Sequence, residues 1–299
     1  MTAGLAHDDT FSILQVACET VGCDAAGAEL LHRSENAIYR LPGNTVVRIS
    51  RPGQLAAAER EVHVAQWLEA SGVPAVQVAP DVEQPVEVDG RSVTFWRELP
   101  NHHHGTPAQV AAALKQLHAL TPPTDFTLGE VAPFVRLEAR IRAATGLSDG
   151  DQRWMLAHLT ALHQRWEERP DGLPWCVIHG DAWVGNVVAT DEDQVILLDL
   201  ERTSIGPPEW DLVHTAIKWS SFGWITAKQY DEFCDVYGHD VTTWAGFELL
   251  RDIREFRMTT MAVQGMESDP QQREQAVHRL ACIRGDLGPR PWGDWTALK

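Results

Sequence analysis

The sequence predicts an α+β fold in which an antiparallel sheet is followed by a larger, mainly helical part. Within the first 100 residues, short β-prone runs alternate with turn signals such as Pro42-Gly43 and Asp89-Gly90, a pattern typical of hairpins. From residue 106 onward most apolar residues recur at helical spacing. An exception is the apolar run 195–198, which we expect to form a strand that leads into Asp199.

The first part is expected to contain two helices and two hairpins. Residues 11–22 have helical spacing and end at a glycine, and residues 54–71 form an alanine-rich helix that also stops at a glycine. Residues 37–41 and 46–49 are the two arms of the first hairpin, and residues 93–96 are the returning strand of the second.

The second part begins after the linker 101–105, whose sequence is NHHHG. Three consecutive histidines suggest a metal site, because imidazole is a common metal ligand. However, adjacent side chains on an extended chain point to opposite sides and cannot surround one ion, so we expect a solvated loop. Thr106 caps and Pro107 opens the next helix, which runs to about residue 120. Further helices are expected at 131–145, 151–168, 209–219, 226–237, 243–262 and 269–284.

Composition narrows the class of protein. The 299 residues are 44% hydrophobic and 22% charged, which is typical of a globular protein. The net charge of −17 argues against a nucleic-acid partner and is compatible with a cationic small molecule, although solubility explains it equally well. No apolar run approaches the roughly 20 residues of a membrane span, so we expect no membrane partner. The five cysteines form no CxxC pair, which together with the polar N-terminal residues favours a cytoplasmic location.

The segment 177–201 carries the strongest chemical signal. Asp181 can accept a proton from an attacking hydroxyl, and Asn186 and Asp199 can offer oxygen atoms to a metal. A hard cation such as Mg²⁺ takes oxygen ligands and keeps phosphate oxygens in its shell. Two metal ligands and a nearby base are the groups that phosphoryl transfer from a nucleotide requires.

This segment resembles the aminoglycoside phosphotransferase family, in which His-Gly-Asp-x-x-x-x-Asn precedes a strand and Asp-x-Glu. The resemblance covers roughly residues 30–260. It implies a bilobal protein-kinase-like fold, with a nucleotide-binding lobe at 1–100 and a catalytic and acceptor-binding lobe at 101–299. It also implies ATP and Mg²⁺ as cofactors and a hydroxyl of a small molecule as the acceptor.

The resemblance implies a phosphate-binding group in the first lobe. Arg48 stands where the family has lysine, a departure because the two cations are not interchangeable. Glu61 is expected to pair with Arg48, with Glu59 as its rival. Ser34 and Asn36 match the segment that covers the nucleotide phosphates.

The adenine base is expected between the lobes. Backbone groups of Glu98 and Leu99 would bond its edge, because the family's hinge lies there. Its faces would be covered by three apolar side chains, namely Ile38, Val47 and Leu198.

Several residues of the second lobe receive supporting roles from the same resemblance. Asp211 is expected to bond the backbone of the loop around Asp181, and His179 and His118 are expected to be structural. Trp183 could line the acceptor pocket, because an indole face can accept a cation. Further candidates for that pocket are Trp219, Trp224, Glu255 and Arg257.

Two alternatives to a small-molecule kinase differ in what they require. A protein kinase needs a long activation segment, and the stretch from Asp199 to Trp210 is too short for one. A pseudokinase that binds nucleotide without turnover is supported only by Arg48, since Asp181, Asn186 and Asp199 are all present. The acceptor stays open between an aminoglycoside, another antibiotic or natural product, and a metabolite such as an amino alcohol, sugar or nucleoside.

Overall fold

The computed structural model describes residues 9–33 and 36–297, which group into two compact units. Of the described residues, the first unit contains those up to Gly105 together with 123–127 and 185–203. The second unit contains 106–122, 128–184 and the described residues from Ser204 onward. The first break between the units along the sequence falls after Gly105. The hairpin that follows Asn186 groups with the first unit, although it comes late in the sequence.

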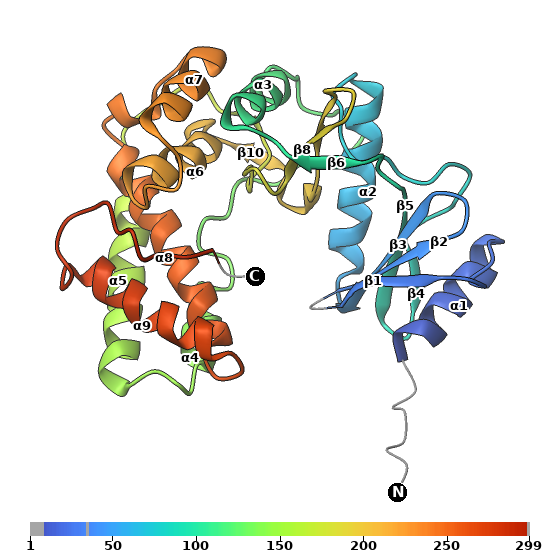
Figure 1. Ribbon diagram of the computed structural model, residues 1–299, viewed down its shortest axis with the longest axis horizontal. Helices are drawn as coiled ribbons and strands as arrows, with labels where there is room; N and C mark the ends of the chain where they lie inside the picture. The colour runs from blue at the N-terminus through green and yellow to red at the C-terminus, as the bar shows by residue number, and fades with distance from the viewer. Residues whose placement is uncertain (1–8, 34–35, 298–299) are drawn as a thin grey trace, which may run out of the picture. The chain divides into compact units, whose positions relative to one another are not determined.

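A five-stranded sheet forms the centre of the first unit (Figure 1). Its spatial order is β1-β2-β3-β5-β4, and every neighbouring pair is antiparallel. The strands are β1 (Glu29–Arg33), β2 (Ala37–Leu41), β3 (Thr45–Pro52), β4 (Val86–Val88) and β5 (Arg91–Arg97). The antiparallel sheet and both hairpins were predicted, whereas β1 was not, because all five of its residues are exposed and it lacks an alternating pattern.

Two helices pack on this sheet. Helix α1 (Asp9–Val21) covers the face that carries Val47, where its buried side chains Ile13 and Leu14 join the apolar cluster. Helix α2 (Leu55–Ala70) contacts β5 and carries Glu61, which reaches Arg48 on β3. Since side chains alternate along a strand, Val47 and Arg48 lie on opposite faces, so α1 and α2 cover different faces of the sheet.

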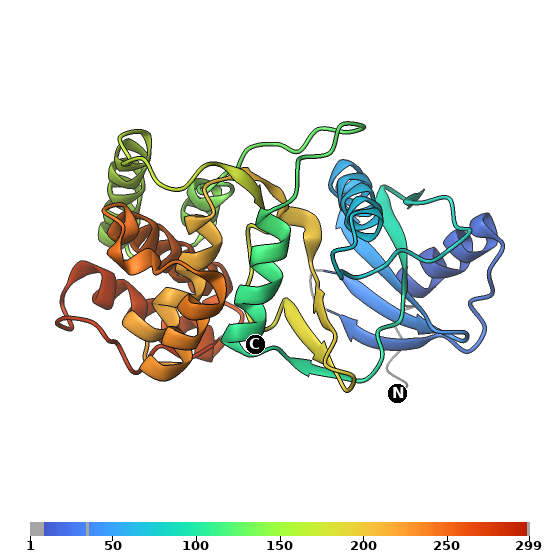
Figure 2. The ribbon, with the colours of Figure 1, turned by 90° about the horizontal axis from the view of Figure 1, so that it is seen from above.

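A smaller three-stranded sheet completes the first unit (Figure 2). Its order is β6-β8-β9, from β6 (His102–His104), β8 (Val187–Thr190) and β9 (Val195–Leu197). The histidine segment is therefore an exposed edge strand rather than the expected loop, because its backbone pairs with β8. Among the described residues no group of three His, Cys, Asp or Glu side chains is placed to hold a metal.

The second unit is mainly helical, as predicted. Its helices are α3 (Pro107–His118), α4 (Leu137–Ala143), α5 (Asp149–Glu167), α6 (Glu209–Ser220), α7 (Ala227–Tyr237), α8 (Phe247–Gly265) and α9 (Pro270–Arg284). Two short strands, β7 (Cys176–Ile178) and β10 (Ser204–Gly206), pair in antiparallel register. Short 3₁₀ turns lie at η1 (Leu200–Arg202), in the first unit, and η2 (Val241–Thr243), in the second.

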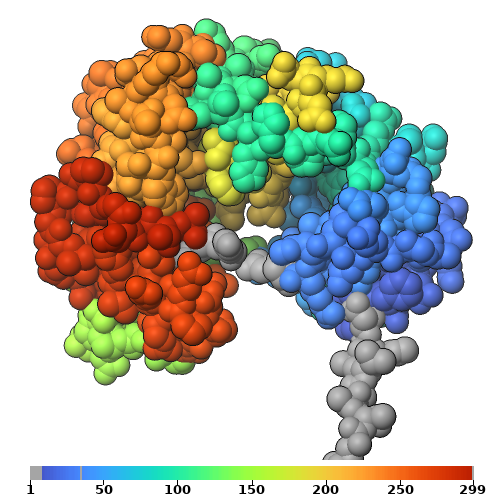
Figure 3. All heavy atoms as spheres, viewed as in Figure 1, coloured from blue at the N-terminus to red at the C-terminus, as the bar shows by residue number. Residues whose placement is uncertain are grey.

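Local signals explain where these helices start and stop. Thr106 accepts a hydrogen bond from the backbone of Gln109 and starts α3 as a capping box, as its sequence predicts. Helix α4 is much shorter than the predicted helix 131–145, because Arg136 adopts a left-handed conformation just before it. Helices α8 and α9 pack together, and α9 and the C-terminal segment (red) fill much of this unit's face in Figure 3. No helix in the described ranges combines the length and apolar character that crossing a membrane requires.

Candidate active site

The predicted pair of Arg48 and Glu61, the proposed phosphate clamp, is formed in the first unit. The Arg48 guanidinium donates two hydrogen bonds to the Glu61 carboxylate, one through Nη1 at 3.2 Å and a shorter one through Nη2. Glu61 is 2% exposed, whereas its rival Glu59 is exposed to solvent. The pairing of Arg48 with Glu61 is therefore confirmed as a structural feature, and its role in phosphate binding stays a prediction.

The sheet register shows which residues share the face of Arg48. Arg48 pairs with Ile38 on β2 and with Thr94 on β5, so these three side chains form one row across the sheet. Trp96 lies near this row, with its ring centroid 5.8 Å from the Arg48 guanidinium carbon. Val47 is on the opposite face, fully buried against α1, so it cannot cover an adenine face as predicted.

The two predicted metal ligands belong to one hairpin of the first unit. Val187 on β8 pairs with Leu197 on β9, and the Leu198 N–H donates to the Asn186 carbonyl at 2.8 Å. Leu198 therefore lies opposite Asn186, and Asp199 is the next residue along the chain. Their side-chain oxygens are hard donors that fit Mg²⁺. Asp199 has φ 54° and ψ 64°, a left-handed conformation that is uncommon outside glycine and often found at functional sites.

The charges of this unit act on one another. Burial lowers the pKa of the Arg48 guanidinium, while the nearby carboxylates of Asp199 and Glu201 act in the opposite direction. The arginine remains charged at neutral pH, since its ordinary pKa is far above 7. A cation held by Glu61 and close to the predicted metal ligands is suited to binding nucleotide phosphates.

The other predicted nucleotide contacts are only partly described. Ser34 lies outside the described residues, while Asn36 is half-buried just before β2. The Glu98 N–H donates to the Asn44 carbonyl at 2.8 Å, and its carboxylate bonds Arg40 at 2.6 Å. Because the Glu98 N–H already has a partner, the proposed hydrogen bonds to the adenine edge would come from the Glu98 carbonyl and from the backbone of Leu99. Ile38 and Leu198 are both half-buried, as a surface that receives a base requires.

The loop that carries Asp181 is anchored in the second unit. The Asp211 carboxylate accepts hydrogen bonds from the His179 N–H at 2.7 Å and from the Gly180 N–H at 2.8 Å. Asp211 is fully buried on α6. Its predicted supporting role is confirmed. Gly180 has φ 83°, a conformation that glycine adopts without strain.

His118 completes this anchor. Its Nε2 lies 3.1 Å from the Asp211 carboxylate, and its Nδ1 lies 2.8 Å from the Tyr237 hydroxyl. Burial alone would raise the pKa of Asp211, but the hydrogen bond from His118, with the charges of His118, His179 and Arg254, keeps that pKa below its usual value. Asp211 is therefore ionised at neutral pH and is positioned to hold the loop rather than to react.

Three side chains beside Asp181 were not predicted. Arg254 on α8 places Nη1 3.7 Å from the Asp181 carboxylate, and its Nη2 donates to the carbonyls of Gly180 and Trp210. His214 on α6 places Nδ1 3.7 Å from the same carboxylate, and Lys218 interacts with it electrostatically. The spacing of four residues on a predicted helix indicated that His214 and Lys218 share a face, but not which residue they face.

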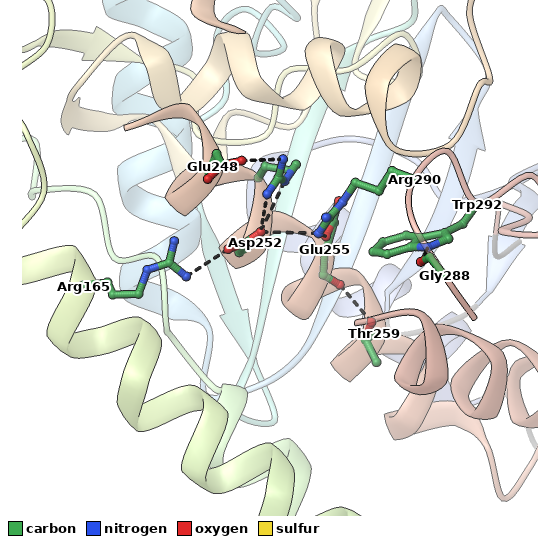
Figure 4. A network of polar contacts seen from close by, with 9 residues as sticks. Arg165, Glu248, Asp252, Glu255, Thr259, Gly288, Arg290 and Trp292 are labelled. Atoms are coloured by element: carbon green, nitrogen blue, oxygen red, sulfur yellow. Dashed lines mark hydrogen bonds and ion pairs between the residues drawn. The ribbon is translucent and has the colours of Figure 1, made fainter. Parts of the chain in front are cut away.

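Two of the predicted acceptor-pocket candidates are held by structural contacts. Figure 4 shows Arg290 between Asp252 and Glu255, and its Nε donates to the Glu255 carboxylate at 2.8 Å. Glu255 is 1% exposed and is neutralised by this contact. The Trp224 indole donates to the Trp295 carbonyl at 2.7 Å. Both side chains therefore have structural partners, and a contact of either one with the acceptor stays a prediction.

Solved structures with the same fold share most of their length with this chain. An amicoumacin kinase bound to AMP-PNP, Ca²⁺ and its antibiotic has a TM-score of 0.74 at 12% identity, covering 97% of this chain and 96% of its own. A choline/ethanolamine kinase family protein from Mesorhizobium loti has a TM-score of 0.60 at 19% identity, covering 94% of both chains. The aminoglycoside phosphotransferase APH(3'')-Id from Streptomyces rimosus has a TM-score of 0.58 at 18% identity, covering 81% of this chain and 98% of its own.

The fold and the site define a small-molecule kinase with a protein-kinase-like fold. The sequence profile of the phosphotransferase enzyme family matches residues 28–250. The chain therefore belongs to the phosphotransferase enzyme family. No curated protein matches the sequence significantly.

Proposed function

We propose that this protein transfers the γ-phosphate of ATP to a hydroxyl group of a small molecule, with Asp181 as the base. The observation that carries the proposal is the anchoring of the Asp181 loop by the two hydrogen bonds to Asp211. A buried anchor of this kind holds a catalytic carboxylate in one orientation. Positioning and charge stabilisation supply most of the catalysis in phosphoryl transfer.

The roles follow from the two groups of residues. Asn186 and Asp199 would hold Mg²⁺, which neutralises phosphate charge when bound. Arg48, oriented by Glu61, would bind phosphate oxygens. The hydroxyl oxygen of the acceptor bonds to the γ-phosphorus while Asp181 accepts the proton of that hydroxyl. The bond between the γ-phosphorus and the bridging oxygen breaks, and ADP leaves. Arg254 places Nη1 3.7 Å from the Asp181 carboxylate, so its positive charge attracts that carboxylate and helps to hold it in place.

The chain between Asp199 and α6 supports a small-molecule acceptor rather than a protein. That stretch contains only η1 and the strand β10, which pairs directly with β7. No residues remain there for a peptide-docking segment. The complete set of Asp181, Asn186 and Asp199 favours turnover over a non-catalytic nucleotide-binding role.

The acceptor could be an antibiotic, as in the amicoumacin and aminoglycoside enzymes, or a metabolite, as in the choline/ethanolamine kinase family. We propose a cytoplasmic location, because the reaction consumes ATP and all five cysteines are unpaired thiols. A resistance role predicts that expression in a susceptible bacterium raises the inhibitory concentration of the phosphorylated antibiotic. Unchanged susceptibility to every acceptor found in vitro would favour the metabolic role.

An ATP-consumption screen over antibiotics, sugars, nucleosides and amino alcohols tests the activity, with Asp181→Asn as the critical variant. We expect this variant to lower kcat by about 10³-fold, because general base catalysis contributes roughly 10²–10⁴. Nucleotide affinity should stay within about threefold of wild type, since the proposed clamp belongs to the other unit. Asp231→Asn, an exposed change on α7, is the matched control. A kcat within tenfold of wild type would contradict the base assignment.

A further inference from the structure

Lys218 is a buried cation for which no close ion pair is found among the described residues. It lies on α6 and is 6% exposed, four residues after His214. Its Nζ lies 5.1 Å from the ring centroid of Trp183, two residues after Asp181. Within the described ranges, no carboxylate lies within 4 Å of this ammonium group, and the group donates no hydrogen bond. A buried charge is normally paired, because removing an ion from water is costly.

The charge on Lys218 persists despite burial. Burial lowers the pKa of Lys218 to about 8, and the charge of Asp181 opposes that shift. A group with this pKa is still mostly protonated at neutral pH. The fold therefore keeps an ammonium ion beside the base in a place where a neutral side chain would be less costly.

Two other basic groups beside Asp181, Arg254 and His214, are engaged or neutral. Arg254 donates to the Gly180 and Trp210 carbonyls, and its guanidinium carbon lies 4.0 Å from the Trp210 ring centroid. Burial, together with nearby cations including Arg254 and Lys218, lowers the pKa of His214 well below its ordinary value, so its imidazole is neutral. Lys218 is thus the cation in this group whose charge is left for a ligand.

We propose that Lys218 binds an oxyanion of the acceptor, so that the substrate is a hydroxylated carboxylic acid or phosphate ester rather than a cationic alcohol. This inference rests on the proposed function, since it concerns the acceptor side of the same site. It departs from the expectation that Trp183 offers its face to a cationic acceptor, because Lys218 already lies against that ring. A second cation there would be repelled by the ammonium group.

The chain allows a direct test of binding, because it has only four lysines, namely Lys115, Lys218, Lys228 and Lys299. Protein labelled with carbon-13 at the lysine ε position gives resolvable NMR signals. The signal of Lys218 is identified because it is missing from the spectrum of the Lys218→Met variant. The probes are glycerate, glycerol 3-phosphate, the neutral glyceramide and the cationic 3-aminopropane-1,2-diol. We expect both anions to shift the Lys218 signal and raise its measured pKa, because an anion favours the charged form.

The NMR responses to the probes report binding at Lys218 and do not depend on phosphoryl transfer. A response to glycerate alone assigns a carboxylate site, and a response to glycerol 3-phosphate alone assigns a phosphate site; either supports the proposal. No response to either anion at about 0.1 M, or an equal response to the amino diol, overturns it. If Lys218 responds to anions while no compound stimulates ATP consumption, the proposed kinase activity fails and the anion site stands.

Turnover gives the second readout. For an anionic acceptor, Lys218→Met should lower kcat/KM by about 30-fold or more, because removing one partner of a buried charge pair has a large effect. For the neutral amide of a carboxylic acid acceptor, kcat/KM should change by less than about threefold in the same variant. The control Lys228→Met alters an exposed residue on α7 and should change kcat/KM for neither the acid nor the amide. An equal loss for the acid and the amide overturns the proposal, since Lys218 would then act on the transferred phosphoryl group.

Discussion

The N–H of Leu198 donates a 2.8 Å hydrogen bond to the carbonyl of Asn186. This bond continues the β8–β9 ladder by one step beyond Val187 and Leu197. It brings Asn186 and Asp199 to the same end of one hairpin, although thirteen positions separate them in the sequence. The proposed metal site therefore depends on strand pairing within the first unit.

Asp199→Ala should abolish Mg²⁺-dependent nucleotide binding. The change removes the carboxylate of the proposed pair, and Asn186 alone offers one neutral oxygen. Isothermal calorimetry with MgATP measures the effect, and Glu192→Ala, an exposed change in the same hairpin, is the control. Unchanged MgATP affinity would show that Asp199 is not a metal ligand.

Arg48→Met should lose both nucleotide affinity and stability. It leaves the buried Glu61 carboxylate unpaired, which costs about 3–5 kcal/mol of unfolding free energy. The double change Arg48→Met/Glu61→Gln should recover most of that stability but not the affinity for ATP. Denaturant unfolding and calorimetry measure the two effects, with the exposed Arg142→Met as a control. Recovery of nucleotide affinity in the double variant would show that the pair is only structural.

Asp211→Asn should destabilise the protein in a pH-dependent way. The folded-state pKa of Asp211 is below its ordinary value, so the stabilisation is fully present above the unfolded pKa of about 3.9. It is lost as the pH falls through the lower, folded-state pKa. The gap in unfolding free energy between wild type and variant should be constant from pH 7 to 5 and should shrink below about pH 4. A gap that does not change with pH would contradict this account.

Lys218 should make stability depend on pH in the alkaline range. Its pKa is about 8 in the folded protein. In the unfolded chain it is about 10.4, so the unfolded state binds more protons between these values. Wild type should therefore gain stability relative to Lys218→Met as the pH rises from about 8 to 10. Thermal unfolding of both proteins across this range measures the gain, and a constant difference would show that Lys218 is not desolvated.

The strand positions show how far local patterns predict this fold. The hairpin at residues 37–49 was predicted because its arms and turn are contiguous, and its register then explains the placement of Arg48 with Ile38. The sequence did not indicate which face of that hairpin would be covered by α1, and Val47 was consequently assigned to the wrong side. Alternation predicts that neighbours differ in face, and only packing decides which face is buried.

The sequence by itself predicted the chemistry: Asp181, Asn186 and Asp199 stand at spacings that resemble those of phosphotransferases. It also predicted Asp211 as the anchor of the Asp181 loop, which the structure confirms. The tertiary structure alone decided what surrounds the base. Arg254 comes from α8 and Lys218 from α6, and helix packing brings both to the loop. Contacts between residues far apart in sequence depend on such packing, which is why the cations beside Asp181 could not be derived from the motif.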